Sequence, residues 1–188
     1  GSPNAPGDLE LMTHQPRFVE EVNQGHLTFL LADEPGLGKT AQALLAAQAA
    51  KAFPLLVVVP NVVKTNWARE VSRWIPNRSV TVVHGDGDGV DAFADVIVVN
   101  YEILDRHVGW LSRFGFKGMV VDEAHFIKNL KSERSKHVIA LSRSIRAANR
   151  SNSSRLDRPF AWIAAASRLA DHSAMSSAMG AFCRFRAP

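Results

Sequence analysis

The chain has 188 residues, enough for one domain with its own hydrophobic core. Hydrophobic residues make up 46% and charged residues 21%, close to the globular average, so most of the chain should fold. The sequence contains no run of 18 apolar residues, the length needed to span a membrane. The single cysteine, Cys183, excludes an intrachain disulfide and fits a reducing compartment. We therefore expect an intracellular protein, cytoplasmic or nucleoid-associated.

The net charge of +4 is unevenly distributed along the chain. Residues 131–188 contain 11 Lys and Arg against 3 Asp and Glu, whereas residues 1–130 contain 11 against 15. A tail that binds nucleic acid and a solvated, partly ordered tail both fit this basic excess. The sequence leaves both interpretations open.

Apolar runs alternate with segments of helical periodicity along most of the chain. Pro16 at a first turn predicts a helix over residues 16–23. Further strands are predicted at 27–32, 55–60, 79–83, 95–99 and 118–122, and further helices at 39–52, 62–74, 101–111 and 132–148. Such β/α alternation predicts an α/β fold, a parallel sheet with helices on both faces, and ligands at the carboxyl ends of the strands. Trp67 and Trp74 are seven residues apart, which favours core packing over base stacking.

The segment Asp33-Glu34-Pro35-Gly36-Leu37-Gly38-Lys39-Thr40 joins strand 27–32 to helix 39–52. A glycine-bearing loop in this position binds nucleotide phosphates, because its N–H groups and the positive end of the helix dipole point to one place. Lys39 would reach the β- and γ-phosphates and the Thr40 hydroxyl would bind Mg²⁺. Predicted ATP contacts in this loop are Asp33, Gly36, Leu37, Gly38, Lys39 and Thr40. Taken alone, the motif also fits a purely structural glycine loop.

A second motif, Asp122-Glu123-Ala124-His125, follows strand 118–122 directly. Asp122, at a strand end beside the phosphate loop, is placed to hold Mg²⁺ through water, and Glu123 is placed to polarise the attacking water. Two acids that cap a strand and begin a helix are the alternative, but the upstream Lys39 and Thr40 favour the nucleotide site. The predicted catalytic residues are therefore Lys39, Asp122 and Glu123.

This pair of motifs resembles those of superfamily-two helicases, and among them the Swi/Snf-type DNA translocases. The resemblance covers residues 11 to about 148, and Ile127-Lys128-Asn129 is more specific to that family than the acid pair itself. The other similar segments occur in the family's order: Leu11, His14 and Gln15; Val57 to Pro60; Asn66-Trp67, Glu70, Trp74 and Pro76; and Asp95 to Leu104.

The resemblance implies a P-loop NTPase with a RecA-like sheet, in which residues 11–148 form the first, ATP-binding lobe. It implies ATP and Mg²⁺ as cofactors and duplex DNA, held by its backbone, as partner. Gln15 would contact adenine, and Lys64, Asn100, Tyr101 and Lys128 are candidates for DNA contact. The implied function is that of a DNA-dependent ATPase, a helicase-like translocase that acts once joined to a second lobe.

Two departures from the family pattern stand out. Pro35 replaces the usual Met, which stiffens the loop and removes one backbone N–H. Nothing after Asn149 resembles the family: the Thr-Gly-Thr-Pro-like segment that couples hydrolysis to lobe movement is missing, as is the second lobe with its arginine finger.

The two ends of the chain carry separate expectations. Residues 1–10, which begin Gly1-Ser2, are expected to be a tag remnant and a flexible start. Residues 149–188 form a basic, Ala/Ser/Arg-rich tail, expected to be poorly ordered or translated out of frame, with a helix-prone segment at 160–182.

Two other functions remain open. One is a truncated, non-catalytic module that binds nucleotide or DNA. The other is the motor lobe of a restriction or RNA-helicase system, which Asn66-Trp67 and Ile127-Lys128-Asn129 disfavour.

Overall fold

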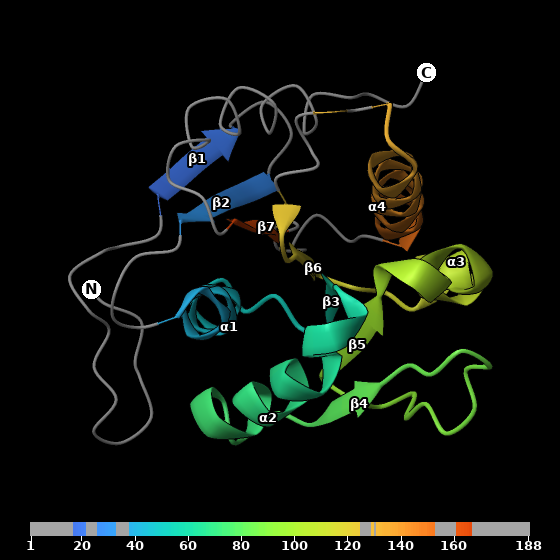
Figure 1. Cartoon of the computed structure of the whole chain (residues 1–188). Helices are drawn as coiled ribbons and strands as arrows, with labels where there is room; N and C mark the ends of the chain where they lie inside the picture. Colours follow the sequence, from blue (N-terminus) through green and yellow to red (C-terminus); the bar gives the residue numbers. More distant parts are fainter. Residues whose placement is uncertain are drawn as a thin grey trace.

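A seven-stranded sheet forms the centre of the computed structural model, which describes residues 17–21, 26–32, 38–124, 129, 131–152 and 161–166 (Figure 1). Its strands are β1 (Arg17–Glu21), β2 (His26–Ala32), β3 (Leu55–Val59), β4 (Val80–Val82), β5 (Val96–Asn100), β6 (Gly118–Val121) and β7 (Ala161–Ala166). The helices are α1 (Lys39–Ala49), α2 (Lys64–Trp74), α3 (Leu104–Arg113) and α4 (Glu133–Asn152). Short 3₁₀ turns, η1 (Asn61–Val63) and η2 (Tyr101–Ile103), lead into α2 and α3.

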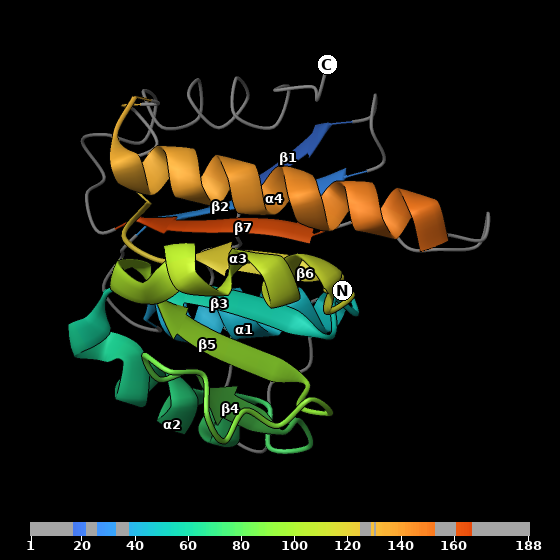
Figure 2. The ribbon, with the colours of Figure 1, turned by 90° about the vertical axis from the view of Figure 1, so that its right-hand side faces the viewer.

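The strands lie in the order β1-β2-β7-β6-β3-β5-β4, which Figure 2 shows from one edge of the sheet to the other. Neighbours from β2 to β4 are parallel, and among the described strands only β1 runs antiparallel, against β2. Every residue of β3 and β5 is buried, as expected for strands covered on both faces. The predicted α/β fold with a parallel sheet is confirmed.

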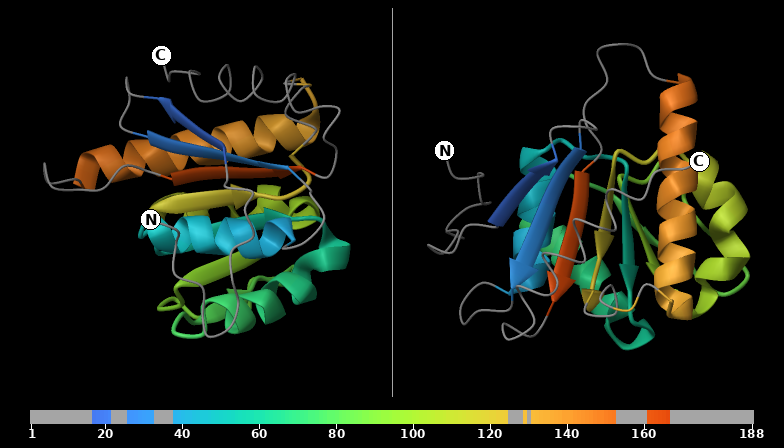
Figure 3. Two further views of the ribbon diagram at one scale, coloured as in Figure 1. Left: turned by 90° about the vertical axis from the view of Figure 1, so that its left-hand side faces the viewer. Right: turned by 90° about the horizontal axis from the view of Figure 1, so that it is seen from above.

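Helices cover both faces of this sheet. Figure 3 shows α1 and α2 on one face and α3 and α4 on the other. Each pair of helices packs on the sheet through its own cluster of buried apolar side chains, since alternate residues of the strands point to opposite faces. On α2 the buried residues are Trp67, Val71 and Trp74, with Trp67 1% and Trp74 5% exposed, which confirms their predicted place in the core.

Lys39 of the first predicted nucleotide motif and Asp122 of the second lie at the carboxyl edge of the sheet. Helix α1 begins at Lys39, after the chain leaves the carboxyl end of β2, and Asp122 directly follows β6. In a parallel α/β sheet, this edge is where ligands bind.

The helix predicted over residues 16–23 is wrong. Residues 17–21 form β1, in which Phe18 lies opposite Phe29 and Val19 opposite Thr28 of β2. Pro16 is compatible with the start of an edge strand as well as with a helix, and the outer edge of β2 offers hydrogen-bond partners to an extended segment.

The helix predicted over residues 160–182 is also wrong for residues 161–166, which form β7 between β2 and β6. The run Ala161-Trp162-Ile163-Ala164-Ala165-Ala166 is apolar throughout, so its periodicity cannot separate a helix from a strand buried on both faces. In the sheet it gains a hydrogen-bonded neighbour on each side, and Ile163 and Ala165 are fully buried. Helix α4 runs past residue 148 to Asn152, so the sheet and its helices extend beyond the predicted lobe boundary.

Within the described residues, no helix is both long and apolar enough to cross a membrane. These residues also contain no group of three or more His, Cys, Asp or Glu side chains placed to hold a metal ion by themselves.

Candidate nucleotide-binding site

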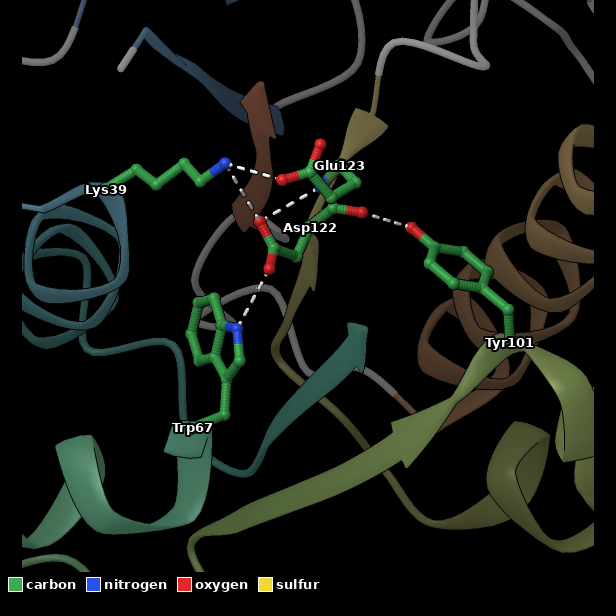
Figure 4. A network of polar contacts seen from close by, with 5 residues as sticks. All are labelled: Lys39, Trp67, Tyr101, Asp122 and Glu123. Atoms are coloured by element: carbon green, nitrogen blue, oxygen red, sulfur yellow. Dashed lines mark hydrogen bonds and ion pairs between the residues drawn. The ribbon is translucent and has the colours of Figure 1, made fainter. Parts of the chain in front are cut away.

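The acid pair is held in place by the strand next to β6. The backbone N–H of Asp122 donates to the carbonyl of Val58 at 2.9 Å, which prolongs the pairing of β6 with β3 by one residue. Asp122 is therefore fixed at the edge of the sheet, and the residue as a whole is only 4% exposed. Lys39 reaches the same point from the first turn of α1 (Figure 4).

Lys39 brings one positive charge to two carboxylates. Its Nζ lies 2.8 Å from Glu123 Oε1 and 3.9 Å from Asp122 Oδ1. The side chains of Lys39, Asp122 and Glu123 are mostly shielded, with relative exposures of 15%, 5% and 28%. The structure thus brings together all three predicted catalytic residues, and with both acids ionised the trio has a net negative charge.

The Asp122 side chain is held by two donors. Trp67 Nε1 donates to Oδ2 at 3.0 Å, and the backbone N–H of Glu123 donates to Oδ1 at 2.9 Å. The Asp122 carbonyl in turn accepts a hydrogen bond from the Tyr101 hydroxyl. Figure 4 shows these contacts converging from α2, the carboxyl end of β5 and α1.

Burial raises the pKa of Asp122 above its usual value, although the Trp67 hydrogen bond and the nearby Lys39 charge act in the opposite direction. Burial, together with the Asp122 charge, also raises the pKa of the Tyr101 hydroxyl well above its usual value. The charge of Asp122 is therefore incompletely compensated by the protein. An oxygen donor in this situation fits Mg²⁺, because a divalent cation would stabilise the ionised form.

Glu123 adopts a backbone conformation that residues other than glycine rarely adopt. Its φ is 54°, in the left-handed region, where a residue with a Cβ costs roughly 1–2 kcal/mol. The turn at Glu123 ends the extended path of β6 and accompanies the contact of its carboxylate with Lys39. Local strain of this kind is found where a side chain must be directed into a site.

The amino end of α1 has the features of an anion site as far as the structure describes it. Gly38 is the N-cap residue in an extended conformation, no side chain caps the helix, and its first turn contains no acidic residue. The first N–H groups of a helix lack intrahelical partners, so these groups and the helix dipole can bind phosphate. Thr40 is half-buried in this first turn. Gln15, Asp33, Gly36 and Leu37 lie outside the described residues.

Three of the four DNA-contact candidates belong to an internal polar network. Lys64 Nζ donates to Val83 O at 3.1 Å and to Asn100 Oδ1 at 2.9 Å, and Asn100 Nδ2 donates to Glu102 Oε2 at 2.7 Å. Asn100 is 3% and Tyr101 6% exposed, so neither side chain presents a surface to DNA. Lys128 lies outside the described residues.

Arg134, at the start of α4, adds a cation to this network. Its NH2 lies 3.8 Å from Glu102 Oε1, and its guanidinium carbon lies 4.8 Å from the centre of the Tyr101 ring. Partial burial opposes ionisation of Glu102, but the Asn100 hydrogen bond and the Arg134 charge outweigh it and lower the pKa of Glu102. Sequence reasoning gave no signal for Arg134, because no motif contains it.

Sequence reasoning also missed the contact from Trp67 to Asp122. In the sequence, Asn66-Trp67 is a segment that resembles the family, and the spacing of Trp67 and Trp74 indicates core packing. Trp67 does pack in the core, but its ring nitrogen also reaches a carboxylate 55 residues away in sequence. A buried tryptophan needs a partner for its N–H, and that requirement was the available signal.

Comparison with known proteins identifies the family of this chain. Residues 16–148, more than half of the chain, match the family described as the SNF2-related domain. The ISWI chromatin-remodeling complex ATPase ISW2 of Saccharomyces cerevisiae is 36% identical over 129 residues, which cover 61% of this chain and 12% of that protein. The SWI/SNF-related matrix-associated actin-dependent regulator of chromatin subfamily A member 1 of Homo sapiens is 36% identical over 135 residues, covering 64% of this chain and 13% of that protein.

A solved structure of the same family is also similar. The Sulfolobus solfataricus SWI2/SNF2 ATPase core in complex with dsDNA matches with a TM-score of 0.63 and 28% identity, over 81% of this chain and 30% of that chain. The chain thus spans about an eighth of the curated relatives and less than a third of this ATPase core. It belongs to the SNF2-related family, and its fold is that of the RecA-like lobe that contains the phosphate loop.

Proposed function

We propose that the chain is the ATP-binding lobe of a Swi/Snf-type, DNA-dependent ATPase. Joined to a second RecA-like lobe, it would couple ATP hydrolysis to movement on duplex DNA inside the cell. The observation that carries the proposal is the convergence of Lys39, Asp122 and Glu123, with Lys39 Nζ 2.8 Å and 3.9 Å from the two acids. Membership of the SNF2-related family supports it.

Nucleotide binding would start at the amino end of α1. The uncapped N–H groups of this turn and the Lys39 ammonium group favour the triphosphate. Thr40 and Asp122 would hold Mg²⁺, which would neutralise phosphate charge when bound. Gln15 for adenine, and Asp33, Gly36, Leu37 and Gly38 for the phosphates, complete the proposed ATP contacts.

Glu123 would act as the base in hydrolysis. Its carboxylate would accept a proton from the water whose oxygen attacks the γ-phosphorus, while the bond from that phosphorus to the bridging oxygen breaks. Lys39, whose Nζ lies 2.8 Å from this carboxylate, would move to the phosphates and end its ion pair with Glu123. Asp122 would remain in place, because its contacts to Trp67 and to the Glu123 N–H do not involve Lys39.

DNA contact would rest mainly on the lysines. Within the described part of the chain, Lys64 donates two hydrogen bonds, and its ammonium group has three N–H donors, so a third could reach a phosphate oxygen. Asn100 and Tyr101, both buried, would support Lys64 and the acid pair from behind rather than touch DNA. Lys128 is retained from the sequence as a further candidate. Backbone contacts of this kind are strongly salt-dependent and carry no sequence preference.

The test is binding and hydrolysis of Mg²⁺–ATP, with and without duplex DNA. The chain alone should bind Mg²⁺–ATP weakly and hydrolyse it near the background rate, because an arginine finger from a second lobe contributes about 10³–10⁵ in rate. Fusion to the second lobe of a family member should produce turnover stimulated by duplex DNA. Stimulation by RNA alone would favour an RNA-helicase system, and binding without turnover in the fusion would favour a non-catalytic module.

A further inference from the structure

Trp67 makes a contact that core packing does not require. Its ring is 1% exposed in the apolar cluster between α2 and the sheet, and its Nε1 donates to Asp122 Oδ2 at 3.0 Å. Figure 4 shows the indole nitrogen turned toward the carboxylate at the end of β6. The packed ring therefore holds its N–H at a fixed point beside Asp122.

Trp74 gives a comparison within the same helix. It is also buried, but its Nε1 donates to Glu70 Oε2 at 2.6 Å, one turn away on α2 itself. Both tryptophans thus satisfy their N–H with a carboxylate, and both pack on the same cluster. Only Trp67 does so with a residue of the candidate site.

The two donors to Asp122 act on different oxygens. Trp67 holds Oδ2 and the Glu123 N–H holds Oδ1, so the carboxylate cannot rotate about its terminal bond without losing a hydrogen bond. A fixed orientation is a property that a metal-binding carboxylate needs.

We infer that Trp67 is a positioning residue, which orients the Asp122 carboxylate for the Mg²⁺ that accompanies ATP. The inference rests on the proposed function, since it assumes that Asp122 binds this ion. Partners that orient a metal ligand change metal affinity by about 10–100-fold when they are removed. Replacement of Trp67 should therefore raise the Mg²⁺ concentration that nucleotide binding requires, and not only lower the stability of the fold.

The first experiment compares Trp67→Phe with Trp74→Phe in the 188-residue chain. Each variant loses one buried indole N–H and a similar volume, so both should lower the melting temperature. Binding of a fluorescent ATP analogue is then measured as Mg²⁺ is titrated. The half-saturating Mg²⁺ concentration should rise at least about tenfold in Trp67→Phe and stay within about twofold of wild type in Trp74→Phe, where only the Glu70 contact is lost.

A second experiment needs no stable Trp67 variant. In the wild-type chain labelled with ¹⁵N, the indole N–H resonance of Trp67 should shift on addition of Mg²⁺ and ATP, and it should differ in Asp122→Asn. The Trp74 resonance should change in neither case. The chain has four tryptophans, so the resonances missing in Trp74→Phe, Trp110→Phe and Trp162→Phe assign three of them and leave that of Trp67.

The outcomes separate the inference from the proposed function. If wild type binds nucleotide with a Mg²⁺ requirement but the two Phe variants change it equally, the inference is overturned and the proposed function stands. An indole resonance of Trp67 that ignores Asp122→Asn overturns it as well. If wild type shows no Mg²⁺-dependent nucleotide binding, the proposed function fails, and the inference with it.

Discussion

The ammonium group of Lys39 forms a 2.8 Å ion pair with the carboxylate of Glu123. The cation proposed to bind the phosphates is thus paired with the acid proposed to activate water. The pair keeps a charge balance at a largely shielded edge of the sheet, where an unpaired ion is costly. In the proposed mechanism, binding of phosphate by Lys39 would end its ion pair with Glu123, because one ammonium group cannot pair equally with the phosphates and with this carboxylate.

Replacement of Lys39 by Ala should abolish measurable binding of Mg²⁺–ATP. The change removes the cation of the site and leaves Asp122 and Glu123 facing the triphosphate, so attraction is replaced by repulsion. Isothermal calorimetry on the folded variant measures the loss. Lys131→Ala, at an exposed position, is the control and should bind as wild type does. Undiminished ATP binding by Lys39→Ala would show that the loop has a structural role.

Glu123→Gln should bind ATP at least as tightly as wild type. The amide removes the negative charge that competes with phosphate for Lys39. In any assembly that hydrolyses ATP, turnover should fall by about 10²–10⁴-fold, the usual contribution of a general base. Calorimetry and a single-turnover assay together measure both effects. Weaker binding would mean that Glu123, and not Asp122, supports the metal-bound nucleotide.

The raised pKa of Asp122 predicts a defined pH dependence of stability. A group whose pKa is raised by folding stabilises the protein at low pH, and this contribution is lost as the pH rises through the folded pKa. The free energy of unfolding of wild type, minus that of Asp122→Asn, should therefore decrease as the pH rises above 3.8. Urea unfolding at a series of pH values gives this difference. Any hydrogen bond lost to the amide adds an offset that does not vary with pH, so a flat or rising difference would contradict the prediction.

Strand β7 should be among the protected parts of the chain. It lies between β2 and β6 with partners on both sides, and Ile163 and Ala165 are fully buried. Amide hydrogen exchange at residues 161–166 should therefore be slow, as at residues 118–121 of β6, because central strands open only with the sheet. Ile163→Asp should prevent folding, since it places an unpaired charge in the core. Fast exchange over residues 161–166 with slow exchange in β6 would show that β7 is not part of the stable sheet.

The predictions that the structure confirms concern contiguous segments. Strand β2, helix α1 and strand β6, which flank the two predicted motifs, are specified by their neighbours along the chain. That the three predicted catalytic residues meet follows from parallel topology, because the ends of β2 and β6 lie at one edge. The roles of Trp67 and Tyr101 could not be predicted in this way, because their partner Asp122 is 55 and 21 residues away and no local pattern specifies the pairing.

By itself the sequence determined the order of most strands and helices, the two nucleotide motifs and the family, because each depends on local composition and spacing. Only the tertiary structure decided that residues 17–21 and 161–166 are strands. A short segment can form a helix or a strand at similar local cost, and the choice depends on which hydrogen-bond partners lie beside it. The outer edge of β2 and the position between β2 and β6 supply those partners, and neither exists until the sheet has formed.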